Sequence, residues 1–267
     1  MTLVRKDRTY RGKPTHHYEL DGVKVTGVTT MLSKGLPKPA LPPWAARTVA
    51  EYVADNADAV RGMLDTMGRE SIVGALKSVP WDKRDEAAAR GTEIHALAER
   101  VISGEDIDVP EHLIGYVQGY VDWLDAWAIT ANMTEVTVGH RPHAGIPGYA
   151  GTFDADVTVG AGDLAGKRGL VDWKTAKGVY GENALQLAAY ARAEFYLDPN
   201  DGTEQPLPGY DFLGVVHVTP TGTDLYLVTD PEASWRIFRH VAYLASQVDV
   251  IKAQITEPTP MPQGDAA

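Results

Sequence analysis

The chain has 267 residues, of which 44% are hydrophobic and 23% charged, a balance typical of a globular protein large enough to bury a core of its own. It contains no cysteine, which excludes disulfides, thiolate-held zinc, iron–sulfur clusters and a cysteine nucleophile, and fits a reducing compartment. No stretch approaches 18 apolar residues and the first twenty residues lack the apolar core of a secretion signal, so we expect a cytoplasmic protein without a membrane span.

The formal net charge is −11 at pH 7, which argues against a protein that coats nucleic acid without specificity. The charge is unevenly distributed, however. Residues 1–50 carry nine Lys and Arg against three acidic residues, a net of +6, whereas the remaining 217 residues carry 16 against 33, a net of −17. This split indicates either a basic arm on an acidic body or an ordinary solvated surface, and charge alone leaves both open.

The first third of the chain reads as a hairpin followed by helices. Residues 17–26 alternate on either side of Asp21-Gly22, a pair typical of a two-residue hairpin turn. Prolines exclude helix and central strand from residues 36–43, so we expect a rigid connector there. Helix is predicted next, with Pro43 in its first turn, and Pro80 is expected to end it.

Two longer helices are predicted at 82–103 and 110–129, and two more at 182–197 and 232–253. Between and around the last two, short β-rich segments alternate with glycine-bearing turns. The predicted strands are 134–140, 148–160, 169–175, 211–218 and 223–229. This order predicts an α/β fold, in which a central mixed β-sheet is flanked by helices and preceded by a largely helical N-terminal elaboration.

The strongest local signal is V-D-W-K-T at 171–175. Because side chains alternate along a strand, Asp172 and Lys174 share one face while Trp173 points to the other. An acid and an amine on a central strand are costly to bury unless they pair with each other or bind something. A plain ion pair at a strand edge and a functional pair both remain open.

Asp154 lies on the preceding predicted strand, within G-T-F-D-A-D. If a loop over 160–168 joins two antiparallel strands, Asp154 comes to lie beside Asp172, where two carboxylates repel each other unless a proton or a cation lies between them. Oxygen ligands of this kind suit Mg²⁺ or Mn²⁺. Asp156, two residues further on, is expected to share the face of Asp154. It is either a competing ligand or, in the interpretation that we favour, a solvated acid.

Two pairs of residues are predicted at i, i+4 spacing on helices. Gly91 and His95 form the first pair, and a glycine inside a helix indicates that another group approaches closely there. Glu99, one turn further on, either supports His95 or is solvated. Gln186 and Tyr190 form the second pair and present an amide and a phenol from one face, either to orient a phosphate or a catalytic lysine or simply to pack on the sheet.

In chain order these residues form four motifs, namely G-T-x-I-H at 91–95, G-T-x-D at 151–154, D-x-K at 172–174 and Q-x-x-x-Y at 186–190. The constellation resembles the PD-(D/E)XK nuclease superfamily, specifically its RecB-type exonuclease domain, over less than half of the chain. The segments H-Y-E-L-D-G-V-K-V-T-G-V-T-T-M-L and P-K-P-A-L-P-P-W are similar to the lead-in of phage-encoded RecB-like exonucleases.

The resemblance implies a restriction-endonuclease-like core. We place this nuclease core at residues 81–255, after an N-terminal hairpin and helical elaboration at 1–80 and before a flexible tail at 256–267. Many relatives also hold an iron–sulfur cluster with four cysteines. This chain has none, so that cofactor and the DNA-end role linked to it are not carried over.

The resemblance further implies a nuclease that depends on Mg²⁺ or Mn²⁺ and leaves 5′-phosphates, most simply a DNA exonuclease in phage DNA recombination, repair or processing. Lys174 would orient the attacking water or neutralise charge on the phosphorane, and Gln186 and Tyr190 would steady the phosphate or Lys174. The implied metal ligands are His95, Asp154, Asp172 and the backbone carbonyl of Trp173.

The basic N-terminal segment would then supply affinity for the phosphate backbone. The expected partners are linear DNA and its ends, together with a phage recombination or annealing protein, in the cytoplasm of a host cell. The predicted DNA contacts are the densest run of basic residues, Arg5, Lys6, Arg8, Arg11 and Lys13.

Two other functions stay open on the sequence. One is a module with the same fold that grips DNA ends or a protein without cutting, and the other is a metal-dependent phosphodiesterase that acts on small substrates in a closed pocket. The motifs also leave open cleavage polarity, strand preference, DNA against RNA, and whether Asp156, Glu99 or Glu135 takes part.

Overall fold

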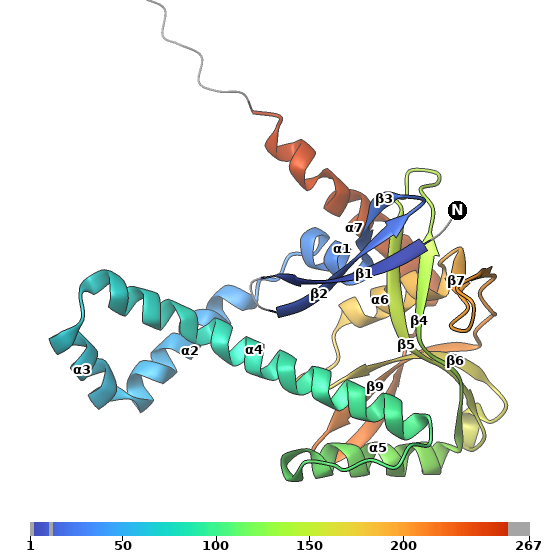
Figure 1. Ribbon diagram of the computed structural model, residues 1–267, viewed down its shortest axis with the longest axis horizontal. Coiled ribbons are helices and arrows are strands. Elements are labelled where there is room, and N and C mark those ends of the chain that lie inside the picture. Colours follow the sequence, from blue (N-terminus) through green and yellow to red (C-terminus); the bar gives the residue numbers. More distant parts are fainter. Residues whose placement is uncertain (1–2, 11–12, 256–267) are drawn as a thin grey trace, which may run out of the picture.

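In the computed structural model, residues 3–10 and 13–255 are described, and they form a mixed β-sheet with helices on both faces (Figure 1). The α/β class predicted from the sequence is therefore confirmed. The helices are α1 (Val28–Gly35), α2 (Leu41–Asp55), α3 (Ala57–Thr66), α4 (Arg69–Ile102), α5 (Ile114–Trp127), α6 (Gly181–Ala191) and α7 (Pro231–Lys252), with 3₁₀ turns at Glu111–Leu113 and Gly162–Leu164. The strands are β1 (Leu3–Tyr10), β2 (Lys13–Leu20), β3 (Val23–Gly27), β4 (Ile129–His140), β5 (Tyr149–Val159), β6 (Arg168–Lys174), β7 (Phe195–Leu197), β8 (Glu204–Gln205), β9 (Phe212–Thr219) and β10 (Gly222–Leu227).

The sheet divides along one edge of β5. Strand β4 pairs antiparallel with β5 over its whole length and so occupies one edge. On the opposite edge, β3 pairs parallel with Tyr149 and Ala150, whereas β6 pairs antiparallel only from Ala155 onward. The segment between, residues 151–154, has no strand beside it on that edge. We call this segment the split of the sheet.

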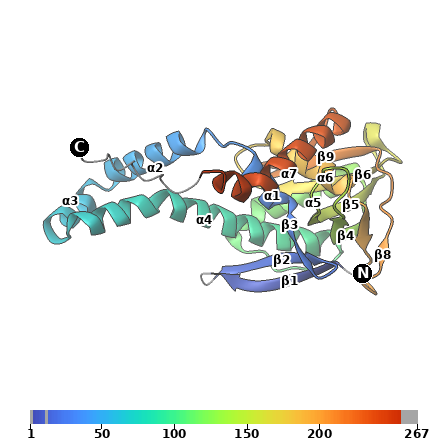
Figure 2. The same ribbon diagram turned by 90° about the horizontal axis from the view of Figure 1, so that it is seen from above.

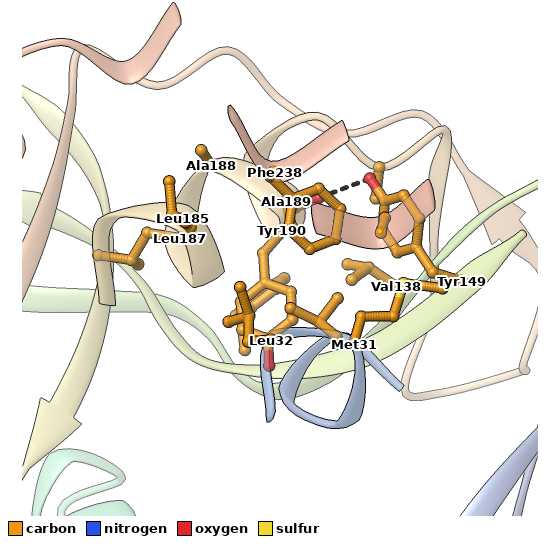
Figure 3. Packing of buried hydrophobic residues seen from close by; sticks show 14 of the residues in the cluster. Met31, Leu32, Val138, Tyr149, Leu185, Leu187, Ala188, Ala189, Tyr190 and Phe238 are labelled. Carbon is orange, nitrogen blue, oxygen red and sulfur yellow. Dashed lines mark hydrogen bonds between the residues drawn. The ribbon is translucent and has the colours of Figure 1, made fainter. Parts of the chain in front are cut away.

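Two hydrophobic clusters pack on opposite faces of the sheet. Helices α1, α6 and α7 cover one face, where Tyr149 donates a hydrogen bond to the carbonyl of Ala189 at 2.8 Å and packs against Phe238 (Figure 3). Helix α5 and the C-terminal half of α4 cover the other face, where Trp173 and Tyr120 are buried in edge-to-face contact. Burial on both faces explains why β5, β6 and β9 are so apolar.

The N-terminal hairpin and α4 lie alongside each other (Figure 2). The predicted hairpin turn at Asp21-Gly22 is present, with both residues at positive φ as a tight two-residue turn requires. A further strand, β1, pairs with β2 along its length. The sequence analysis did not predict β1, nor helix α1. Helices α2 and α3 and the start of α4 project away from the sheet (Figure 1).

The expectation that Pro80 ends a helix is wrong, because α4 runs through it from Arg69 to Ile102. A proline inside a helix removes one N–H donor, and here Pro80 and the adjacent Val79 are both buried, so packing offsets the lost bond. The helix thus passes without interruption from the predicted elaboration into the predicted core.

Two other boundaries differ from expectation. The predicted connector ends at residue 40, because α2 begins at Leu41 and takes in Pro42 as well as Pro43 in its first turn, where no N–H donor is needed. The helix predicted to reach residue 197 ends at Ala191. The N–H of Glu194 donates to the carbonyl of Gly139 at 2.8 Å, which brings the following residues into the sheet as β7.

None of the helices in the described part of the chain is both long and apolar enough to cross a membrane. The tail predicted at 256–267 lies outside the described residues.

Candidate active site

A cleft of about 750 Å³ opens at the split of the sheet, between the N-terminal hairpin and α4. Residues of all four sequence motifs line it, although they come from a helix, two strands and a second helix. The motif residues in its lining are Gly91, Thr92, His95, Gly151, Thr152, Asp154, Asp172, Lys174, Gln186 and Tyr190.

Asp154 lies at the point where β5 and β6 separate. The two strands are antiparallel, as predicted, and their pairing ends at Ala155 with Val171, so Asp154 follows directly opposite Asp172. Beyond that pair, Oδ2 of Asp154 accepts the backbone N–H of Trp173 at 2.7 Å. The carboxylate therefore takes the place of the backbone carbonyl that a continuing ladder would supply.

Asp172 is 1% exposed and is held by groups from two elements. It forms an ion pair with Lys174, its neighbour on the same face of β6, and its Oδ1 accepts a hydrogen bond from Nε2 of Gln186 at 2.8 Å. Nε2 of Gln186 also lies 3.3 Å from the hydroxyl of Tyr190. The i, i+4 pair on α6 thus fixes the carboxylate that β6 presents.

Tyr190 explains the glycine of the G-T-x-D motif. A Cβ at residue 151 would lie 2.4 Å from the Tyr190 ring, a separation that packed atoms do not tolerate. Gly151 therefore lets the aromatic ring of α6 lie directly on β5, one turn of helix from Gln186. Tyr190 is almost fully buried, and this burial raises the pKa of its phenol.

His95 approaches the carboxylates from α4. Its Nδ1 lies 3.8 Å from Oδ2 of Asp154, and it also hydrogen-bonds the Trp173 backbone. Burial and the nearby Lys174 lower the pKa of His95, so the imidazole is neutral at pH 7. The close approach expected at Gly91 is present, because a Cβ there would lie 3.2 Å from the hydroxyl of Thr175.

Asp154, Asp172 and Lys174 form the floor of the cleft. Their protonation states follow from burial and from the repulsion between the two carboxylates. Burial and the charge of Asp172 raise the pKa of Asp154 well above its ordinary value. Burial alone would lower the pKa of Lys174, but the carboxylates of Asp172 and Asp154 raise it. The floor thus holds a protonated Lys174 beside an acid, Asp154, that binds a proton unusually tightly.

This donor set fits a hard divalent cation. Two buried carboxylates and a neutral imidazole are the oxygen and nitrogen ligands that Mg²⁺ and Mn²⁺ accept, and a cation would neutralise the same repulsion that retains the proton on Asp154. Among the described residues, no three His, Asp or Glu side chains already converge into a cation site. Asp172 is instead paired with Lys174.

Two further acids, Glu99 and Glu135, line the cleft. The side chain of Glu135 is exposed in the cleft, and partial desolvation by the cleft walls, with the charges of Glu99 and Asp172, raises its pKa to about 7. Glu135 has φ of 51°, in the left-handed region, although it lies within β4. The sequence analysis left open whether Glu135 takes part, since nothing in the alternation of β4 marks this residue.

Asp156 is neither a ligand in the cleft nor the solvated acid that we favoured. It is fully buried and accepts hydrogen bonds from Arg168 at 2.7–3.1 Å and from Asn132 at 2.8 Å. The ligand alternative fails because it assumed regular alternation from Asp154, and the solvated interpretation fails because Arg168 and Asn132 hold the carboxylate inside the protein. Asp156 is a structural ion-pair partner of the neighbouring strand.

The basic residues of the N-terminal segment divide between the cleft and other surroundings. Arg5 and Arg8 line the cleft, as do Lys24 and Lys34, which the sequence analysis did not single out. Lys6 instead forms an ion pair with Glu19. Of the other two predicted DNA contacts, Arg11 lies outside the described residues, and only the backbone of Lys13 is described, in β2.

Comparisons with known proteins add little to this picture. No family model and no curated protein matches the chain. Among solved structures, the crystal structure of a protein named SSO0001 is similar over 85% of this chain and 76% of that one, at 14% identity and a TM-score of 0.33. A similarity at this level carries no argument about function.

Proposed function

We propose that the protein is a nuclease that depends on Mg²⁺ or Mn²⁺ and hydrolyses phosphodiester bonds. Its substrate would be the ends of linear DNA, and its process phage DNA recombination or repair. One observation carries the proposal: the polar residues of all four motifs line a single cleft together with Arg5, Arg8, Lys24 and Lys34. Acids on the floor and basic side chains in the walls are what a metal-assisted attack on a polyanion requires.

Asp154, Asp172 and His95 would hold the metal. When bound, the cation would polarise the scissile phosphate and lower the pKa of a coordinated water. The neutral state of His95 supports a ligand role, because only an unprotonated ring nitrogen can coordinate. The raised pKa of Asp154 supports a site that exchanges a proton for a cation.

Lys174 would supply positive charge next to the reacting phosphate. Its pKa is raised, so the ammonium is charged at pH 7 and can only donate hydrogen bonds. Gln186 would keep the Asp172 carboxylate oriented through its 2.8 Å hydrogen bond, and Tyr190 supports Gln186 from within the core.

The first test is incubation of labelled linear and circular DNA with the protein in Mg²⁺, Mn²⁺ or EDTA. We expect linear DNA to be shortened in either metal and to remain intact in EDTA. Asp172→Asn and Lys174→Ala should each lower the rate on the order of 10³-fold or more, since each removes a charge from the transition state. Asp224→Asn, at an exposed residue of strand β10, is the matched control and should cut like the wild type.

A protein that binds the DNA but yields no product in either metal would point to the second candidate, a module that holds DNA ends without cutting. The ion pair between Asp172 and Lys174 favours that candidate, because a carboxylate already neutralised by lysine is less available to a cation. Calorimetric titration with Mn²⁺ separates the two, since the binding module needs no metal.

A further inference from the structure

The alternation of side chains reverses in the middle of both β4 and β5, at Glu135 and Asp154. In a regular strand, residues two apart share a face. Phe153 nevertheless packs in the cluster under α6 and α7, whereas Ala155 packs in the cluster on the opposite face. On β4, Met133 and Val136 are three residues apart and pack against the same cluster.

The two reversals coincide in space. The register pairs Thr134 with Ala155 and Val136 with Phe153, which places Glu135 and Asp154 opposite each other between those pairs. Of these two residues, Glu135 alone has a positive φ. A left-handed residue turns the chain by an amount that no extended residue can, so the reversal originates at Glu135 and β5 follows to keep its pairing.

The reversal determines where Asp154 points. If alternation continued back from Ala155, Asp154 would share the face of Asp156, which is buried against Arg168 and Asn132. Instead its carboxylate lies at the split of the sheet, accepts the N–H of Trp173 and comes within 3.8 Å of His95. We propose that Glu135 is a positioning residue whose left-handed backbone, rather than its carboxylate, delivers Asp154 to the cleft.

The choice of side chain at residue 135 tests this proposal. Glycine adopts the left-handed region freely, glutamine has the conformational preference of glutamate without its charge, and valine disfavours the region most because of its branched Cβ. The readout is the hydrogen-exchange rate of the Trp173 amide, measured by NMR, because that amide is protected by the Asp154 carboxylate. This readout does not depend on any activity.

We expect Glu135→Gly and Glu135→Gln to keep the Trp173 amide as protected as in the wild type. Glu135→Val should raise its exchange rate more than tenfold, as should Asp154→Ala. Thr134→Val, which puts the same branched side chain one residue earlier on extended backbone, is the matched control and should leave the rate unchanged. If Glu135→Val does not fold, Glu135→Ala replaces it, with faster exchange expected than in Glu135→Gly.

Equal protection in the valine (or alanine) and glycine variants would overturn the proposal, as would loss of protection in Glu135→Gln, which would assign the role to the carboxylate. The relevance to catalysis rests on the proposed function. If the wild type cuts no DNA, that function fails while the exchange result still decides whether Glu135 positions Asp154.

Discussion

At the scale of single residues, the chemistry of the cleft depends on how one buried acid is ionised. Asp154 is within reach of Asp172 and of the Trp173 amide, and its raised pKa means that folding favours its protonated form. A carboxyl whose pKa is higher in the folded than in the unfolded state contributes stability at low pH. That contribution is lost as the pH rises from about 4, the unfolded value, through the raised folded pKa.

Asp154→Asn should therefore be more stable than the wild type at pH 8 in EDTA, with a difference that shrinks toward pH 4. The amide oxygen of asparagine can still accept the Trp173 N–H, so the comparison isolates the charge. Chemical denaturation across this pH range measures the difference, with Asp224→Asn as control. Parallel pH profiles for Asp154→Asn and the wild type would contradict the assignment.

Adding Mn²⁺ should reverse the order of stability. The wild type would gain about 2.7 kcal/mol at a metal concentration one hundred times its dissociation constant, whereas Asp154→Asn, which lacks one ligand, would gain far less. The same denaturation experiment with and without Mn²⁺ gives both values.

At the scale of elements, the site depends on how closely α4 approaches the end of β6. Gly91 lies against Thr175, the first residue after β6, and His95 follows one turn later on α4. The chain after Thr175 is fixed in turn, because the carbonyl of Ala176 lies 2.7 Å from Nε2 of His217 on β9. Helix and loop are thus packed tightly at a single glycine.

Gly91→Val should push α4 away from this loop and cost about 1–3 kcal/mol through overpacking. Thr175→Ala makes room and should recover part of that loss, so the two changes are expected to be coupled by about 0.5 kcal/mol or more. Unfolding free energies of the two single variants and the double variant give the coupling. Additive effects would mean that the contact with Thr175 is not the reason why residue 91 is a glycine.

The sequence predicts such contacts well where a local rule applies. The i, i+4 spacing placed Gly91 with His95 and Gln186 with Tyr190, and the alternation of β6 paired Asp172 with Lys174. Where a strand departs from regular alternation, prediction fails. Regular alternation misplaced Asp156 and could not decide whether Glu135 takes part, because neither reversal leaves a trace in the pattern of polar and apolar residues.

At the scale of the whole molecule, the uneven charge has a definite location. The net charge of −11 repels a polyanion, but the cleft gathers Arg5, Arg8, Lys24 and Lys34 opposite the acids of its floor. The sequence indicated the basic segment but not which of its residues face the cleft, because that depends on where β3 joins the sheet.

Changing Arg5, Arg8 and Lys24 to alanine should flatten the salt dependence of DNA binding. Each phosphate contact contributes about 0.9 to the logarithmic slope on duplex DNA and about 0.7 on single strands, so a loss of about two to three units is expected. Binding is measured against salt concentration in a Lys174→Ala background, which keeps the substrate intact.

The matched control for this experiment changes Arg69, Lys77 and Arg236, three exposed basic residues that do not line the cleft. An equal loss of slope in both triple variants would show that binding follows net charge and not the cleft.

The parallel pairing of β3 with β5 also has a consequence for the order of folding. It joins Thr26 to Tyr149, so closing the intervening chain of about 120 residues costs roughly 4 kcal/mol of loop entropy. The adjacent strands β4 and β5 are joined by a short turn, so their pairing costs much less loop entropy. We expect amides of β3 to gain protection after those of β4 and β5 in pulsed hydrogen exchange. During synthesis at about 5–20 residues per second, the hairpin then waits several seconds for its partner strand, and no cleft exists until it docks.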